Sequence, residues 1–233
     1  MTRAGLIYLY KILSLGFAYP EGKNWIMLEK MLSESEGLLD GEILAMLKEF
    51  KNSLTDNRHR IDNMKSEYLN IFDIGRKISP YETEYLTEKI SRKPFELADI
   101  SGFYSAFDFS INEDMTNKES VDHISVELEF MAIIALKEEY ARGIKQKENE
   151  NIVHEAGRKF LQEHLARWGF YYCLQIQELE CDSFYKKLGS ILESVLSSEC
   201  ERYGLDASSF KKKMNRDLYK GAREEVLTCD PII

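Results

Sequence analysis

Apolar side chains recur every three to four residues along most of the chain, and alternating strand-like runs are scarce. Leu6, Leu9, Leu13 and Phe17 form the first such stripe, which is typical of an amphipathic helix. The same spacing predicts helices over 2–17, 22–33, 41–54, 58–72, 95–107, 122–146, 148–166, 168–180, 182–203 and 207–219. We therefore expect an all-α protein, a single-domain helical bundle of about nine to eleven helices spanning residues 1–233.

Two stretches interrupt the helical spacing. Residues 73–86 form a connector in which Pro80 pushes Ser79 toward extended backbone. Tyr81 and Tyr85 are large side chains in this connector, and we expect them to pack on other elements. Residues 109–120 are polar, charged and free of strong periodicity, so we expect a lid or a hinge there.

The stretch Val121–Met131 joins polar residues to the longest apolar helix of the chain. Residues 122–146 are apolar on almost every face, which is typical of a central helix covered by its neighbours. Asp122 is placed to be the N-cap of that helix, His123 follows in the first turn, and Glu127 lies one turn further on. Two interpretations stay open, a cap with a packed neighbour or a binding site. Catalysis by His123 lacks a Ser or Cys nucleophile in a recognisable turn.

Acidic residues are concentrated between Glu67 and Glu129. This window holds 14 Asp and Glu against six Lys and Arg, and the net charge of the whole chain is −9. The balance argues against nucleic acid as a partner, because phosphates need Lys and Arg. A cationic partner would suit the window, and the simpler alternative is a set of solvated helix faces.

The cysteines and the N-terminal segment predict a cytoplasmic protein. The four cysteines form no CxxC pair, which favours isolated, reduced thiols. Lys11 interrupts the first apolar segment, so we interpret it as a core helix rather than a secretory signal. No segment reaches the ~18 uncharged apolar residues that a membrane span needs.

Common cofactor and metal signatures are missing from the sequence. It contains neither a phosphate-binding P-loop nor a dinucleotide-binding glycine motif. A di-metal site in a bundle would need Glu-x-x-His pairs, and only His59 has an acidic residue three positions earlier, at a helix break. We expect His164 to be a packed, hydrogen-bonded histidine at a helix end. No cofactor and no metal are therefore predicted, and a helical metal- or small-ligand-binding enzyme is kept as the alternative.

Four motifs in a common order give the chain a family resemblance. EYLNIF at 67–72 resembles the pattern E-[YF]-x-x-L-F, and SPYETEY at 79–85 resembles a connector that bears proline, aromatic residues and Glu. DHISVELEFM at 122–131 is similar to D-H-[LI]-x-x-E-L-x-F-[ML], and FLQEHLARW at 160–168 is similar to F-x-x-x-H-L-x-x-W. With these motifs the chain resembles the TorD/DmsD/NarJ-type redox-enzyme maturation proteins, the cytoplasmic chaperones of molybdopterin enzymes. Val121 departs from the pattern, because many members have proline before the Asp-His pair.

The resemblance implies a TorD-like fold and a function without catalysis. Family members bind the N-terminal signal of a molybdopterin oxidoreductase catalytic subunit, often a twin-arginine leader. They hold the apo form until its cofactor is inserted, and so delay export. The partners would be that signal peptide and that subunit, and the protein would be a monomer or a domain-swapped dimer. The peptide-binding residues that the resemblance implies are Tyr68, Leu69, Phe72, Pro80, Tyr81, Glu82, Asp122, His123 and Glu127.

The acidic window fits such a ligand on chemical grounds. The arginines of a leader need carboxylates in bidentate geometry. The apolar stretch behind them needs a groove with aromatic walls. The window offers both kinds of group, and its aromatic residues include Tyr68, Phe72, Tyr81, Tyr85 and Tyr104.

Overall fold

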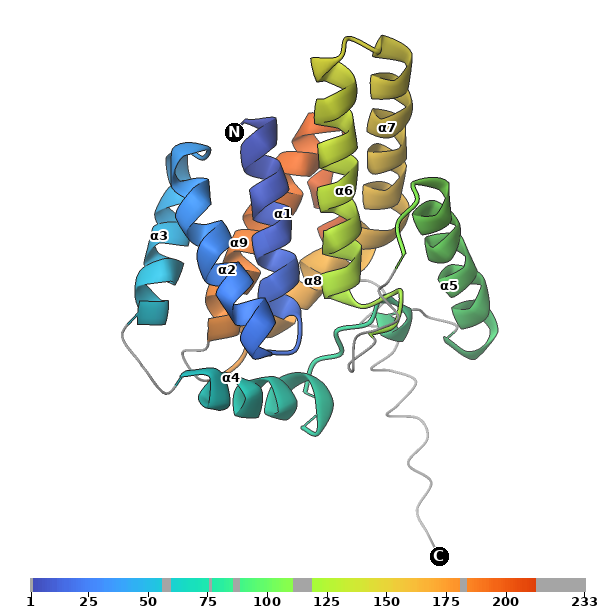
Figure 1. Ribbon diagram of the computed structural model, residues 1–233. Helices are drawn as coiled ribbons and strands as arrows, with labels where there is room; N and C mark the ends of the chain where they lie inside the picture. Colours follow the sequence, from blue (N-terminus) through green and yellow to red (C-terminus); the bar gives the residue numbers. More distant parts are fainter. Residues whose placement is uncertain are drawn as a thin grey trace, which may run out of the picture.

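The protein is an all-α bundle, as the hydrophobic spacing predicts. The computed structural model describes residues 2–55, 60–75, 77–85, 89–110, 119–180 and 184–212. In this part of the chain the α-helices are α1 (Arg3–Phe17), α2 (Gly22–Glu34), α3 (Gly41–Thr55), α4 (Arg60–Tyr68), α5 (Lys89–Ala106), α6 (Ile124–Gly143), α7 (Lys147–Phe160), α8 (Ala166–Gln177) and α9 (Phe184–Arg202) (Figure 1). The predicted fold class is therefore confirmed.

Helices α1 and α6 lie side by side at the centre of the bundle (Figure 1). Thr2 caps α1, because its Oγ1 accepts a hydrogen bond of 3.0 Å from the Gly5 N–H. The predicted stripe of α1 is buried, and so are Leu128 and Phe130 of α6. Burial of these apolar side chains is the main driving force that holds the two helices together.

Two helices contain π-helical turns, and one of these turns lies close to a break that the sequence predicts. A π turn at Leu161–Leu165 joins α7 to α8, and another at Leu69–Asp73 extends α4. Each π turn adds a residue to the helical repeat, so the apolar stripe shifts by one position and resembles a boundary. The predicted separation of 148–166 from 168–180 is therefore wrong, since residues 147–177 are continuously helical.

Helix α5 starts at Lys89, six residues before the predicted start at 95. Pro94 lies inside it and removes one backbone N–H donor near its beginning. The helix nevertheless persists, and an ion pair of 3.1 Å between Arg92 and Glu96 spans the proline. The sequence rule that a helix follows rather than includes a proline fails at this position.

The remaining boundaries agree with the sequence where the structure describes them. Gly204 follows α9 with φ of +68°, and the Leu205 N–H bonds to the Cys200 carbonyl, which is the expected glycine-terminated helix end. Residues 207–212 are helical, whereas the rest of the predicted helix 207–219 lies outside the described residues. Most of the predicted lid or hinge at 109–120 lies outside them as well. No described helix is long and apolar enough to cross a membrane.

Candidate functional site

A pocket of about 870 Å³ opens where α4 ends and the connector begins. Its volume falls in the usual range of ligand-binding pockets. Helix α4 lies across one end of the bundle (Figure 1). The residues that line it are Tyr19, Tyr68, Leu69, Phe72, Asp73, Ile78, Ser79, Pro80, Tyr81, Glu84, Lys93 and Glu119.

The pocket separates the predicted peptide-binding residues into two groups. The five that line it are Tyr68, Leu69, Phe72, Pro80 and Tyr81. The other four are buried outside the pocket lining, each 1% exposed or less, and they are Glu82, Asp122, His123 and Glu127. The first group can touch a ligand directly, whereas the second group supports the pocket from within the protein.

The π turn after α4 supplies one wall of the pocket. Leu69, Phe72 and Asp73 all belong to this five-residue turn. The rings of Phe72 and Tyr19 pack against the Tyr68 ring, with centroids 5.2 and 5.3 Å away. Tyr19 comes from the end of α1 and is missing from the sequence prediction, because nothing in the local sequence links it to the motif at 67–72.

The connector also lines the pocket and is held by backbone pairing with the start of α6. The Glu82 N–H bonds to the Asp122 carbonyl (2.9 Å), and the Ile124 N–H bonds to the Pro80 carbonyl (2.8 Å). Tyr81 and His123 thereby form an isolated antiparallel bridge. This pairing explains why a segment without helical spacing keeps a defined position.

Asp122 ties the connector to α6 and does not cap the helix. Its Oδ2 accepts hydrogen bonds from the Thr83 Oγ1–H (2.6 Å) and the Thr83 N–H (3.3 Å). The N-cap of α6 is His123, whose Nδ1 accepts a hydrogen bond from the Ser125 N–H (3.2 Å). The prediction of Asp122 as N-cap is therefore wrong, because a stronger partner in the connector takes its carboxylate.

His123 is neutral and has a defined tautomer. Burial lowers the pKa of His123 to about 3, so the ring carries no charge at neutral pH. Since Nδ1 accepts from the Ser125 N–H, the ring proton is on Nε2. Nε2 lies 3.3 Å from the Tyr68 hydroxyl oxygen, which therefore accepts a hydrogen bond from His123. The buried His123 thus contacts the pocket through Tyr68.

The carboxylates of the pocket have different partners. Glu84 is paired with Lys93 at 3.1 Å. Glu119 Oε2 accepts a hydrogen bond of 3.0 Å from the Tyr81 hydroxyl. Burial raises the pKa of Glu119, and the nearby Asp73 raises it further, although the bond from Tyr81 opposes the shift. The region around Glu119 and Asp73 is therefore electronegative and partly withdrawn from water.

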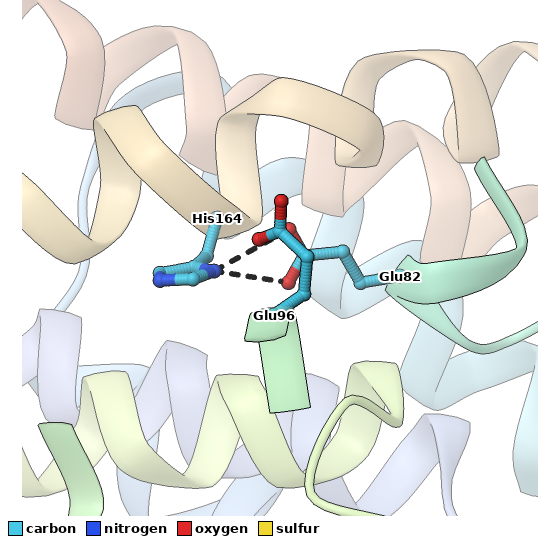
Figure 2. Close-up of side chains that lie close together, drawn as sticks. All are labelled: Glu82, Glu96 and His164. Atoms are coloured by element: carbon cyan, nitrogen blue, oxygen red, sulfur yellow. Dashed lines mark hydrogen bonds and ion pairs between the residues drawn. The ribbon is translucent and has the colours of Figure 1, made fainter. Parts of the chain in front are cut away.

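A cluster of buried polar side chains attaches the connector to α5, to the second π turn and to α8. Figure 2 shows Glu82 from the connector, Glu96 from α5 and His164 from the second π turn pointing toward one another. His164 Nδ1 lies 3.2 Å from Glu82 Oε2. Arg167 donates to Glu82 Oε1 (2.7 Å) and Glu96 Oε2 (3.0 Å) through one nitrogen. The cluster joins three separate elements through charged hydrogen bonds.

The same cluster contains the residue types of a metal site. One ligand atom each of Glu82, Glu96 and His164 lies within 4.8 Å of the others. The Arg167 guanidinium, however, binds both carboxylates and supplies the positive charge that a metal would bring. The set therefore fits a structural ion-pair cluster better than an open metal centre. Sequence spacing could not find this group, because its members come from three distant segments.

Glu127 completes the buried cluster as a neutral acid. Burial raises the pKa of Glu127 well above its usual value, and the neighbouring Glu82 raises it further. Its Oε2 accepts a hydrogen bond of 3.2 Å from the Trp168 indole N–H. Its other oxygen, Oε1, is buried and has no hydrogen-bond partner among the described residues.

His164 differs in position from its prediction. It is buried and hydrogen-bonded, as expected, but it lies inside a continuous helix at the π turn rather than at a helix end. Its ring packs against Phe160 and Phe103, with centroids 5.1 and 5.5 Å away. The π turn explains how a polar residue enters the core without ending the helix.

Comparison with known proteins agrees with the motifs that form this site. The family described as "Nitrate reductase delta subunit" matches residues 36–173. A chlorate reductase assembly chaperone protein from Ideonella dechloratans is 27% identical over 190 residues, which cover 79% of this chain and 84% of the relative. A selenate reductase assembly chaperone protein from Thauera selenatis is 27% identical over 201 residues, which cover 85% and 89%. The chain belongs to the nitrate reductase delta subunit family, which confirms the NarJ/TorD-type resemblance of its sequence motifs.

Proposed function

We propose that the protein is an assembly chaperone of a molybdopterin oxidoreductase and has no catalytic activity of its own. It binds the N-terminal signal of the catalytic subunit, of the twin-arginine type, and holds the apo form in the cytoplasm. Cofactor insertion and assembly are thereby completed before export. The names of the chlorate and selenate reductase relatives support the general role in assembly.

The observation that carries the proposal is the pocket, because two of the family motifs line it together with Tyr19 and Glu119 from distant parts of the sequence. Tyr68, Leu69 and Phe72 come from the first motif, and Pro80 and Tyr81 come from the second. Rings and carboxylates line the same cavity, so it can receive an apolar side chain and a cationic one. This combination suits a leader in which arginines precede an apolar stretch.

The buried residues of the prediction have a supporting role in this proposal. Asp122 binds Thr83 of the connector, and His123 donates to the Tyr68 hydroxyl. Glu82 joins the connector to His164, and Glu127 binds the Trp168 indole. A ligand would therefore touch the aromatic wall and the carboxylates of the pocket rather than Asp122 itself. The predicted lid or hinge at 109–120, and with it a domain-swapped dimer, stays a prediction.

A titration with synthetic leader peptides tests the proposal. The probe carries two consecutive arginines and an apolar stretch, and the control peptide has the same composition in scrambled order. We expect saturable binding of the probe by calorimetry, with a loss of about tenfold or more for Tyr68→Ala and for Phe72→Ala. Leu174→Ala, on an exposed site of α8 away from the pocket lining, serves as the control variant. Equal binding of the scrambled peptide would overturn the proposal.

Metal analysis of the purified protein tests the alternative of a metal-dependent enzyme. The cluster of Glu82, Glu96 and His164 is the observation that favours this alternative. The chaperone proposal predicts substoichiometric iron, zinc and manganese, because Arg167 occupies the carboxylates. One equivalent of tightly bound metal that disappears in His164→Gln would support the alternative.

A further inference from the structure

In the described part of the chain, two of the three carboxylates that line the pocket, Asp73 and Glu119, lack a cationic partner. The third, Glu84, is paired with Lys93, and the buried Glu82 and Glu96 outside the lining are paired with Arg167. Among the described residues, no Lys or Arg forms an ion pair with Asp73 or Glu119, although both line the cavity. Glu119 lies 3.9 Å from His123 Nε2, but His123 is neutral and adds no charge.

The surroundings of these two carboxylates are built from aromatic and hydrogen-bonding groups. The Tyr81 hydroxyl holds Glu119, and the rings of Tyr19, Tyr68 and Tyr81 line the same cavity. Tyr68 is almost fully buried, and its hydroxyl oxygen already accepts a hydrogen bond from His123. The hydroxyl proton of Tyr68 is therefore left for another acceptor, either Glu119 or a group of the ligand.

We propose that Glu119 and Asp73 form the subsite for a single arginine side chain of the bound peptide, and that His123 positions the Tyr68 hydroxyl to bind an adjacent backbone carbonyl. The proposal rests on the proposed function and adds which charge of the ligand is recognised and where. It assigns recognition to the carboxylate pair that lines the pocket rather than to the buried Asp122 and His123.

The chemistry favours a guanidinium over an ammonium ion. A guanidinium is planar, weakly hydrated, and able to stack on aromatic rings while it donates to two acceptors. The ionised form of Glu119 is disfavoured by burial, and an arriving cation would offset that cost. The one other carboxylate in the lining, Glu84, already has Lys93, so the described pocket offers room for one arginine and not for two equivalent ones.

A double-mutant cycle between protein and peptide tests the arginine subsite. Each arginine of the synthetic leader is replaced in turn by citrulline, which keeps the shape and removes the charge. We expect Glu119→Gln and Asp73→Asn to weaken binding of the parent leader by about tenfold to a hundredfold. With one citrulline peptide these substitutions should cause almost no further loss, whereas with the other the full loss should remain.

Glu84→Gln is the matched control for the carboxylate substitutions, because Glu84 lines the same pocket but is bound by Lys93. Its effect should be less than about threefold. Equal losses for Glu84→Gln and Glu119→Gln, or losses that are independent of both citrulline substitutions, would overturn the subsite. Loss of leader binding in Tyr68→Ala with no effect of Glu119→Gln would leave the proposed function intact and refute the subsite alone.

A small probe tests the subsite even if the leader does not bind. N-acetyl-arginine amide is titrated against the full-length protein while the tyrosine side-chain NMR signals are followed. The expected result is a saturable shift that Glu119→Gln abolishes and that N-acetyl-citrulline amide does not produce. A shift that persists in Glu119→Gln would count against the carboxylate pair.

The positioning role of His123 has its own test. His123→Asn keeps an acceptor for the Ser125 N–H but removes the donor to Tyr68, while Tyr68→Phe removes the hydroxyl and keeps the ring. We expect each substitution to weaken leader binding by about fivefold to tenfold, and the double variant to be no weaker than Tyr68→Phe. Independent, additive losses would show that His123 does not act through Tyr68.

Discussion

Asp122 illustrates how a single buried carboxylate can hold a pocket wall. Its Oδ2 binds both the N–H and the hydroxyl of Thr83, and the side chain is almost inaccessible to water. Replacement by alanine would leave two buried donors of Thr83 without a partner. We expect Asp122→Ala to lower the free energy of unfolding by about 3 kcal/mol, measured by urea denaturation. Thr83→Val completes a double-mutant cycle, and strict additivity of the two losses would contradict this account.

The protonation of His123 gives a pH dependence of stability with a defined sign. The pKa of His123 is about 3 in the folded protein and near 6.5 in the unfolded chain, so the unfolded state binds the proton more readily. The contribution of neutral His123 is therefore complete above pH 6.5 and is lost as the pH falls toward 3. His123→Asn removes this titration.

We expect the stability of His123→Asn relative to the wild type to increase by about 2 kcal/mol between pH 6.5 and pH 5. The difference between the two proteins cancels the opposing titration of Glu127, whose raised pKa favours folding at lower pH. Denaturation curves at several pH values measure it. A constant difference across this range would show that His123 is not neutral in the folded protein.

At the level of residues, the sequence predicts the aromatic side chains of the pocket more accurately than its hydrogen bonds and charged groups. Tyr68, Phe72 and Tyr81 are large aromatic residues in motifs, and the structure places them in one cavity. The local capping rule assigns Asp122 to the N-cap because it cannot include Thr83, which lies 39 positions away. The sequence does not predict Glu119 as a pocket residue, because its place in the lining and its raised pKa depend on neighbours from other segments.

At the level of elements, π-helical turns carry much of the site. One supplies Leu69, Phe72 and Asp73 to the pocket, and the other inserts His164 into the core. A π turn contains one residue more than the α-helical repeat accommodates, and it redirects the side chains that follow. Hydrophobic spacing therefore predicts these helices but not the positions at which a π turn changes the direction of their side chains.

Deletion of Asn70 tests the role of the first π turn. Asn70 is exposed and lies within this turn, so its removal would restore the α-helical register. The residues that follow, including Phe72 and Asp73, would rotate by about 100°. We expect leader affinity to fall at least about tenfold while circular dichroism shows unchanged helix content. Asn70→Ala keeps the chain length and should bind normally; equal losses in both variants would exclude the register as the cause.

On the scale of the whole molecule, the sequence predicts the bundle because its helices are long and strongly periodic. The burial of α6 between its neighbours follows from apolar residues on almost every face. The attachment of α5 was not predictable in this way. Its charged contacts to the rest of the protein depend on Glu96 and Arg167, which are 71 positions apart and have no common motif.

The polar cluster around Arg167 joins α5 to the connector and to the start of α8, so a substitution of Arg167 tests how α5 is attached. Arg167 binds Glu96 of α5 and Glu82 of the connector, and both carboxylates are buried. In Arg167→Met the two carboxylates would remain buried without their cation and would repel each other. Breaking a buried pair in this way costs about 3–5 kcal/mol. We therefore expect the beginning of α5 to open locally.

Hydrogen exchange measured by mass spectrometry distinguishes local opening from general destabilisation. In Arg167→Met, peptides that cover residues 91–99 should exchange at least about tenfold faster, whereas α1 should exchange as in the wild type. Arg158→Met is the matched control, since Arg158 forms a surface ion pair of 2.6 Å with Glu155 in the same helical run. Because Glu82 also fixes the connector, leader affinity should fall in Arg167→Met and not in Arg158→Met. Uniformly faster exchange in all helices would mean that the cluster stabilises the whole bundle rather than the attachment of α5.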